Sequence, residues 1–468
     1  MVNTTSRLFA VREITTGRPR MAVPKPQVVA AEDDLTPVAG VALWGPLLDR
    51  LNLIGVADEL ALRKIGPGGY SGGQCYRALV ETMLAGGDFL SDVDLLRDEA
   101  TAKLRGPHVL PSHDTLWRFC DQADLGRVAK AAAVNRVMLA RAWEAGAAPA
   151  PGILTIDPDA TKVATYSRTK QGSTFSYNYT GTCVHPIVGV FAETGEVCAI
   201  RGRAGNANPG RALGSFIDEC VAAVPEHRRG DYQLWVRIDS AGYAEQVVDT
   251  CEKHDTWFSI TAKKFTNVTG AIERLATDPA TRWKNAKGHE KRLGSQIAET
   301  ELTFAGQRLR LVVRRQRAGV DGDAQLALDD IDGWRFHAII TNIPARMRNA
   351  VNIEAHHRLR GGIPEDAIRG LKEGFGFNHA PLSDFFGNWL WEQACAAAYN
   401  TSVWLRRLAL PDTWQRIRTK RLRLTLFNVP ARVGTHARRL QLRFARHYRH
   451  AADFAAALDR LHALPVFT

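Results

Sequence analysis

The stretch YQLWVRIDSAGY, residues 232–243, decides the fold class of this chain. Apolar residues dominate it up to Ile238, which is the pattern of a buried strand. Asp239 follows, and Ser-Ala-Gly then turns the chain away. Two interpretations fit a carboxylate at the end of such a strand: it caps the next helix, or it binds a metal ion. The rest of the sequence has to distinguish them.

The region around this strand contains further strand and helix patterns, because the apolar period changes from 3.6 to 2 near residue 151. The predicted elements are strands at 153–157, 174–192 and 196–204, a helix at 208–224 that begins near Pro209, the strand at 232–239, a helix at 243–254 and a strand at 257–263. Three antiparallel strands followed by crossover helices predict an α/β fold, with a mixed β-sheet and flanking helices. This is the layout of a ribonuclease H-like fold, in which the first and fourth strands are neighbours.

The chain is basic: its 468 residues carry a formal net charge of +12. Such a charge favours a polyanionic partner, most often DNA or RNA. Seven scattered cysteines without a C-x-x-C pair argue against a zinc site and against a disulfide framework. No apolar run reaches the about 18 residues that a membrane span needs. We therefore expect a cytoplasmic protein with no membrane partner.

The positive charge is concentrated near the C-terminus. Between Asp412 and Asp453 there is no acidic residue, and eleven Lys and Arg residues lie in the same stretch. Four of these arginines occur at helical spacing with apolar neighbours: Arg438, Arg439, Arg443 and Arg446. A basic helix in contact with nucleic acid is the prediction, and a helix that simply faces solvent is the alternative.

Carboxylates end two of the predicted strands. Asp157 and Asp159 end the first one and Asp239 ends the fourth, so neighbouring strands would bring two acidic groups together. Like charges at close range raise each other's pKa, and a divalent cation removes that cost. Hard oxygen ligands select magnesium or manganese.

A third acid is found in HHRLRGGIPEDAIRGLKEG, residues 356–374. Pro364 is typical of a helix start, which puts Glu365 in the first turn. On this helix Glu365, Arg369 and Lys372 share a face, which suits a site that binds a phosphate beside a metal. The alternative is a Glu favoured by the helix dipole and paired with Arg369.

These motifs together resemble bacterial insertion-sequence transposases of the Asp-Asp-Glu (DDE) type, in the group with a β insertion before the Glu, and within it the 1380-type family. IDPDAT (156–161), HPIVGVFAETGEVCAIRGRAGNANP (185–209) and RIDSAGY (237–243) resemble the family's motifs. Its third motif is Tyr, Arg, Glu and Lys, and Arg360, Glu365 and Lys372 match the last three. His357 stands in place of the Tyr, and one extra residue separates Arg360 from Glu365.

The resemblance implies a catalytic and metal-binding set of Asp159, Asp239 and Glu365, with Asp157 as the alternative to Asp159, and two Mg²⁺ or Mn²⁺ ions. It implies DNA contacts by Arg237, His357, Arg360, Arg369 and Lys372. Relatives hold a flipped base on a tryptophan of the insertion, for which Trp283 and Trp334 are the candidates. The expected partners are double-stranded DNA, as terminal inverted repeats and target, and a second copy of the chain. The expected location is the bacterial cytoplasm and nucleoid.

The segments expected from these patterns are a flexible arm at 1–38, a helical DNA-binding domain at 39–150, the catalytic domain at 151–265 and 346–410, a β-rich insertion at 266–345, and a basic helical C-terminal region at 411–468. The predicted function is cut-and-paste DNA transposition. The alternatives are a non-catalytic DNA-binding regulator derived from a transposase, and a nuclease of the same fold that never joins strands.

Overall fold

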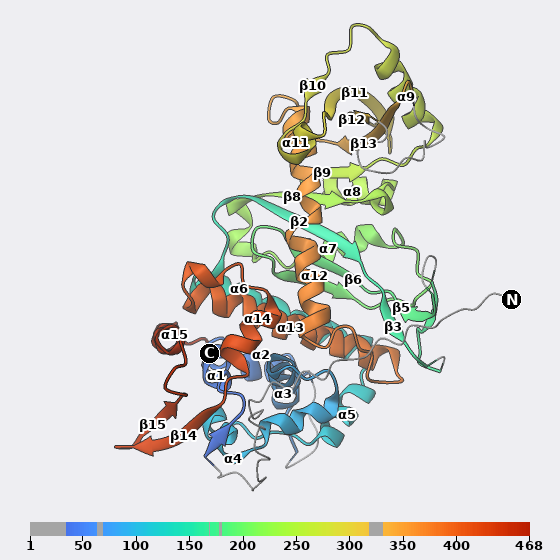
Figure 1. Ribbon diagram of the computed structural model, residues 1–468. Coiled ribbons are helices and arrows are strands. Elements are labelled where there is room, and N and C mark those ends of the chain that lie inside the picture. The colour runs from blue at the N-terminus through green and yellow to red at the C-terminus, as the bar shows by residue number, and fades with distance from the viewer. Residues whose placement is uncertain (1–33, 63–68, 168, 177–179, 318–330) are drawn as a thin grey trace, which may run out of the picture.

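The computed structural model describes residues 34–62, 69–167, 169–176, 180–317 and 331–468. Most of the arm expected at 1–38 lies outside these residues. A large mixed sheet forms the centre, with helices below it and on its faces (Figure 1). No helix within the described residues is long and apolar enough to cross a membrane.

The central sheet has nine strands in the order β10-β11-β12-β13-β9-β8-β2-β6-β7. Five of them belong to the predicted sheet: β2 (Gly152–Ala160), β6 (Ile187–Phe191), β7 (Val197–Arg201), β8 (Tyr232–Ile238) and β9 (Trp257–Thr261). β8 is parallel to β2 and to β9, whereas β6 is antiparallel to both of its neighbours. The expected adjacency of the first and fourth strands is confirmed by the pairing of β2 with β8.

The register of β2 and β8 determines which side chains meet at their ends. It runs from Gly152 opposite Tyr232 to Ile156 opposite Val236. This is a constant offset of 80 residues, from 232 − 152 and 236 − 156. Both strands are buried through most of their length, as is usual for parallel strands covered on both faces. If the same register continues for three residues beyond Ile156 and Val236, Asp159 lies beside Asp239.

Helices α7 (Leu213–Val221) and α8 (Glu245–Lys253) connect β7 to β8 and β8 to β9. The helix expected to begin near Pro209 begins at Leu213 instead, because Ala212 before it has a left-handed backbone with φ of 55°.

The N-terminal region is helical, as predicted, and contains α1 (Val41–Arg50), α2 (Leu53–Glu59), α3 (Gly72–Ala85), α4 (Glu99–Arg105), α5 (His113–Asp121) and α6 (Leu125–Ala142). The long helix α13 (Phe385–Ala409) packs against α3, α5 and α6 on one side and against β7 on the other. It therefore joins the helical region to the sheet.

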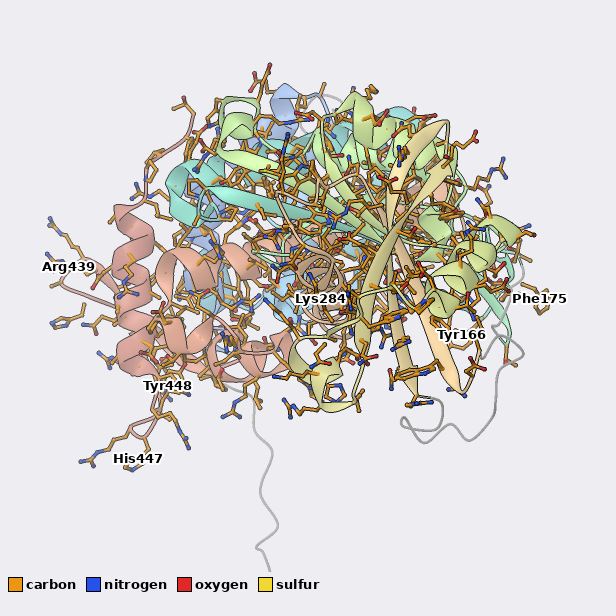
Figure 2. The ribbon with its side chains drawn as sticks, turned by 90° about the horizontal axis from the view of Figure 1, so that it is seen from above. Tyr166, Phe175, Lys284, Arg439, His447 and Tyr448 are labelled. Atoms are coloured by element: carbon orange, nitrogen blue, oxygen red, sulfur yellow. The ribbon has the colours of Figure 1, made fainter. Side chains whose placement is uncertain are left out.

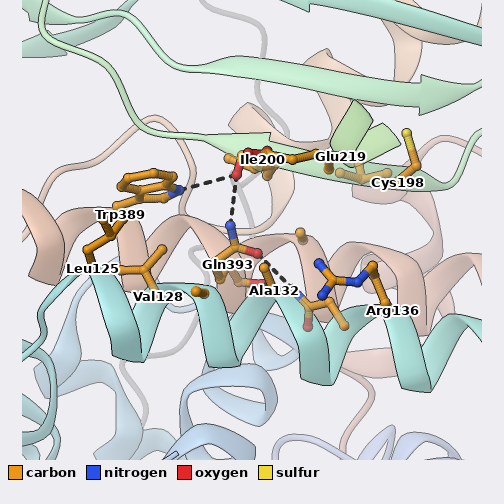
Figure 3. Close-up of a pocket in the computed structure, with 14 residues that line it drawn as sticks. Leu125, Val128, Ala132, Arg136, Cys198, Ile200, Glu219, Trp389 and Gln393 are labelled. Atoms are coloured by element: carbon orange, nitrogen blue, oxygen red, sulfur yellow. Dashed lines mark hydrogen bonds between the residues drawn. The ribbon is translucent and has the colours of Figure 1, made fainter. Parts of the chain in front are cut away.

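The outer edge of β7 is closed by side chains of α13. Asn400 accepts a hydrogen bond from Val197 N and donates one to Val197 O, both at 2.8 Å. Trp389 and Gln393 both donate to Ile200 O (Figure 3). A cavity of about 190 Å³ lies here between α6, α13 and β7. Since an uncovered edge can pair with another strand, these amides prevent the sheet from extending on this side.

The region expected as a β-rich insertion lengthens the same sheet on its other side. It contributes α9 (Thr266–Thr277), β10 (Lys284–Asn285), α10 (Gly288–Arg292), β11 (Gln296–Phe304), β12 (Gln307–Arg317) and β13 (Trp334–Thr341). β13 pairs with β9, with Ile340 opposite Ile260. The chain then returns through α11 (Ala350–Arg358) and α12 (Ile363–Gly374).

The C-terminal prediction was wrong in part, because the basic segment forms a β-hairpin where a helix was expected. β14 (Ala431–His436) and β15 (Arg439–Arg443) pair with each other, and β14 also pairs with β1 (Leu35–Thr36). Leu440 and Leu442 follow a period of two, and β1, nearly 400 residues earlier, supplies a third strand. The end of the expected arm is therefore a strand. Helix α15 (Ala451–Ala463) follows the hairpin.

Candidate active site

Asp157 and Arg237 form a buried ion pair below the end of the β2–β8 pair. Arg237 Nε lies 2.8 Å from Asp157 Oδ1, and its Nη2 donates to the other carboxylate oxygen. Both side chains are at most 2% exposed. Arg237 Nη1 also donates to His356 O, which ties α11 to the sheet. Arg237 was expected to contact DNA; in this structure its side chain is buried and its donors are taken by Asp157 and His356.

Asp159 and Asp239 lie two residues further along the same strands and share a cationic partner. Arg360, from the 3-10 helix Leu359–Gly361, places Nη2 at 3.1 Å from Asp159 Oδ1 and 3.8 Å from Asp239 Oδ2. Asp239 Oδ1 also accepts a hydrogen bond from Ala241 N at 2.8 Å. Asp239 therefore caps the following turn with one oxygen and faces Arg360 with the other, so the two interpretations of this residue are not exclusive.

The pKa of Asp159 is raised above its ordinary value. Burial is the main cause, and the carboxylates of Asp239 and Glu365 add to it, while the charge of Arg360 opposes it. Both other predicted acids act on this carboxyl, so Asp239 and Glu365 each lie within electrostatic range of Asp159.

Helix α12 presents the expected face to an open cavity of about 400 Å³ beside Asp159. Glu365, Arg369 and Lys372 all line this cavity. Lys372 Nζ donates to Lys162 O at 2.7 Å, in the loop that follows β2. Arg369 pairs with Asp366 at 3.0 Å, and not with Glu365 as the alternative interpretation of this helix had it.

His357 does not reach the cavity. It is 5% exposed, its Nε2 lies 3.1 Å from Thr261 Oγ1, and its Nδ1 lies 3.0 Å from Ser259 Oγ. Burial is the main cause that holds its pKa well below the ordinary value, with His337 and Arg360 adding to the effect. The imidazole is therefore neutral and joins α11 to β9, and the DNA contact expected of His357 would require it to leave this buried position.

Trp283 and Trp334 lie together on the insertion, both half-buried. The guanidinium of Arg315 lies 4.0 Å from the ring centroid of Trp283 and 4.4 Å from that of Trp334. Arg317 covers Trp334 at 4.1 Å. Arginines already stack on these rings. A flipped base would therefore have to displace an arginine or stack on the opposite face of the ring.

The chemistry of the donor set fits a divalent cation. Among the described residues no group of three or more His, Cys, Asp or Glu side chains is arranged as a finished metal site. Asp159 and Asp239 nevertheless converge on one positive group, the guanidinium of Arg360. Two hard oxygen donors on neighbouring strand ends, with Glu365 nearby, are the ligand type that Mg²⁺ and Mn²⁺ prefer.

Sequence reasoning missed the roles of Arg237 and Arg360. The signal for Arg237 was present: Asp-x-Asp at 157–159 and Arg-x-Asp at 237–239 have the same internal spacing. On parallel neighbours with an offset of 80 residues, that spacing pairs Asp157 with Arg237 and Asp159 with Asp239. No comparable signal placed Arg360 between the carboxylates.

The family model for the transposase DDE domain, group 1, matches residues 66–466 of this chain. A cryo-EM structure of the piggyBac transposase synaptic complex with hairpin DNA is similar in fold, with a TM-score of 0.42 and 11% sequence identity, covering 82% of this chain and 78% of that chain. No curated protein matches the sequence.

Proposed function

Since the chain belongs to the group 1 family of DDE-domain transposases, we propose that it binds the terminal inverted repeats of a mobile element, cleaves the element ends and joins them to target DNA. The observation that carries this proposal is the convergence of Asp159 and Asp239 on one cationic group beside the cavity lined by Glu365. We also infer a ribonuclease H-like catalytic fold, which the strand order β7-β6-β2-β8-β9 supports.

Asp159, Asp239 and Glu365 would hold the divalent ions, of which we propose two per site. Bound there, such ions activate the attacking oxygen and stabilise the leaving oxygen of a phosphodiester. The raised pKa of Asp159 supports this assignment, because a carboxylate beside like charges gains most from a cation.

Arg360, Arg369 and Lys372 would position the DNA backbone. Arg360 is the residue closest to the carboxylates, and its planar guanidinium suits a bidentate phosphate contact. Lys372 lines the cavity two helical turns from Glu365, about 10.5 Å along the axis for seven residues. This distance would allow Glu365 to bind the metal while Lys372 contacts a flanking phosphate. Holding the scissile bond in one orientation accounts for a large part of such catalysis.

The exposed arginines of the C-terminal region would add affinity that does not depend on sequence. Arg438, Arg439, Arg443 and Arg446 are all exposed, and no acidic residue lies near them in sequence. We further propose that two copies of the chain act together, because two element ends have to be joined.

The test is a strand-transfer assay with labelled element ends and Mg²⁺. The parent protein is expected to nick the ends and join them to a target duplex. Asp239→Ala should lose both steps and keep end binding, because it removes a metal ligand at the surface. Binding without cleavage by the parent would favour a non-catalytic regulator, and cleavage without joining would favour a nuclease. Normal cleavage by Asp239→Ala would overturn the site assignment.

A further inference from the structure

The hairpin β14–β15 projects from the body of the molecule (Figure 1). Its base is anchored, because Ala431 and Val433 are 2% and 1% exposed and β14 packs against α4. Beyond this base the residues from Thr435 to Leu440 are all exposed. Arg439 lies at the outer limit of the molecule in Figure 2. The third strand, β1, pairs with Ala431 and Arg432 at this base, so within the described residues the outer part of the hairpin is an exposed two-stranded ribbon.

The tip of the hairpin has an unusual backbone. Ala437 and Arg438 have φ of 49° and 61° and form the two-residue turn between His436 and Arg439. Turns of this kind favour Asn-Gly or Asp-Gly, because other residues are strained at positive φ. Strained positions are concentrated at functional sites. An alanine and an arginine therefore adopt a backbone that they rarely take, at the exposed tip of the hairpin.

The charge of the ribbon identifies the chemistry of its partner. Arg438 and Arg439 are exposed, and neither has an ion-pair partner in the part of the chain that the structure describes. Arg443 donates only to Gln441 Oε1, at 3.2 Å. No acid lies between residues 412 and 453, and Asp34, which reaches the hairpin from outside this segment, pairs with Arg432 at its base, so the charge at the tip is available to an anionic partner. A polyphosphate backbone is the partner that compensates a run of arginines.

The shape of the ribbon selects one groove of duplex DNA. Two strands about 4.8 Å apart, with side chains on both edges, fit the major groove of about 12 Å and exceed the minor groove of about 6 Å. The arginines at the tip suit the same groove, since Arg pairs with guanine edges there. Leu440, 51% exposed, follows Arg439 in β15 and therefore points to the opposite face of the ribbon.

We propose that the β14–β15 ribbon lies in the major groove of duplex DNA, with Arg438 and Arg439 against the base edges. This inference rests on the proposed function, because it takes DNA as the substrate. It goes beyond a general basic surface, since it assigns a secondary-structure element to a groove and two side chains to base contacts.

The experiment compares two duplexes of one sequence, of which one carries glucosylated hydroxymethyl groups on its cytosines. The glucose fills the major groove and leaves the phosphates and the minor groove free. Fluorescence anisotropy is measured for the full-length chain without divalent ions. The parent is expected to bind the glucosylated duplex about tenfold more weakly, equivalent to about 1.4 kcal/mol. For R438Q/R439Q the ratio of the dissociation constants for the glucosylated and the plain duplex should fall to near one.

The matched control is R416Q/R418Q, which removes two exposed arginines of the same basic segment outside the ribbon. It should weaken binding to both duplexes equally and keep the parent's ratio. The inference is overturned if R438Q/R439Q keeps the parent's ratio, or if distamycin, which fills the minor groove, removes the affinity that depends on Arg438 and Arg439. Loss of strand joining with an intact binding ratio would overturn the proposed function alone, because the binding assay needs no catalysis.

Discussion

Arg360 Nη2 lies 3.1 Å from Asp159 Oδ1, so an arginine stands beside the carboxylate that we assign to metal binding. The same nitrogen is 3.8 Å from Asp239 Oδ2. One guanidinium thus compensates two acids that would otherwise repel each other across the ends of β2 and β8. A cation that binds between these acids has to share them with Arg360 or move it aside.

Arg360→Gln should therefore increase the effect of a divalent ion on stability. Without Arg360 the two carboxylates repel in the metal-free protein, and Mg²⁺ relieves a larger cost. We expect the rise in melting temperature on addition of Mg²⁺ to be larger than in the parent by about 2 °C. Arg369→Gln is the control, because Arg369 lines the same cavity but pairs with Asp366. A Mg²⁺ effect equal to or below the parent's would contradict the sharing of ligands.

Asp157 and Asp159 should respond oppositely to replacement by Asn. Asp157→Asn leaves the charge of Arg237 buried without its partner, which typically costs about 3–5 kcal/mol of stability. Asp159→Asn removes a carboxylate that is 32% exposed and has no buried charge depending on it, so the fold should persist while nicking of element ends is lost. Denaturant unfolding and a nicking assay on both variants check this. A stable but inactive Asp157→Asn, with an active Asp159→Asn, would make Asp157 the metal ligand.

Local patterns were sufficient to predict the elements that carry the acids. The strand before Asp239, its pairing with the strand of Asp159 and the face shared by Glu365 and Lys372 follow from short-range periodicity and sheet topology. The features that could not be predicted, the burial of His357 and the hairpin at 431–443, depend on long-range contacts. The burial of His357 depends on Ser259 and Thr261, about 100 residues earlier. The hairpin at 431–443 depends on a strand at the other end of the chain, and a run as short as RLQLR is compatible with either period.

The exposed arginines predict a change in salt dependence. Each phosphate contact contributes about 0.9 to the slope of log K against log salt. Replacing Arg438, Arg439, Arg443 and Arg446 by Gln should flatten the slope by about 2, because Arg438 and Arg439 face base edges in our proposal and Arg443 and Arg446 are left to contact phosphates. Titration of a duplex at several salt concentrations measures it. An unchanged slope would show that this face binds protein or solvent.

Glu392 predicts a pH dependence of stability. This side chain of α13 is 5% exposed, and its Oε2 has no hydrogen-bond partner within the described structure. Burial raises its pKa from the ordinary 4.5 to about 8. Between these values the folded protein keeps a proton that the unfolded chain has lost, so the free energy of unfolding falls as pH rises, by up to about 1.4 kcal/mol per pH unit.

Glu392→Gln should remove this contribution, because the amide cannot ionise. Between pH 5 and pH 8 the parent's melting temperature should fall more than that of the variant, and the variant should be the more stable at pH 8. The other titrating groups are common to both proteins, so the difference between the two curves reports Glu392. Parallel curves would mean that Glu392 titrates alike in the folded and unfolded chains.

Replacement of Glu365 and of Lys372 by Ala should have different effects on cleavage. Glu365→Ala removes a proposed metal ligand and should abolish cleavage. Lys372 Nζ donates to Lys162 O in the loop after β2, so Lys372→Ala loosens that loop and removes a cation from the cavity beside Asp159. Cleavage should fall by about 10- to 100-fold, since misplacing the substrate slows the reaction without removing its chemistry. Lys372→Arg keeps the charge but changes its geometry, so its rate should be intermediate.

Single-turnover cleavage with element ends in excess over their Kd separates the rate from binding. If Lys372→Ala cleaves at the parent rate with the parent's affinity, Lys372 serves only the loop, and the DNA backbone is positioned by Arg360 and Arg369 instead.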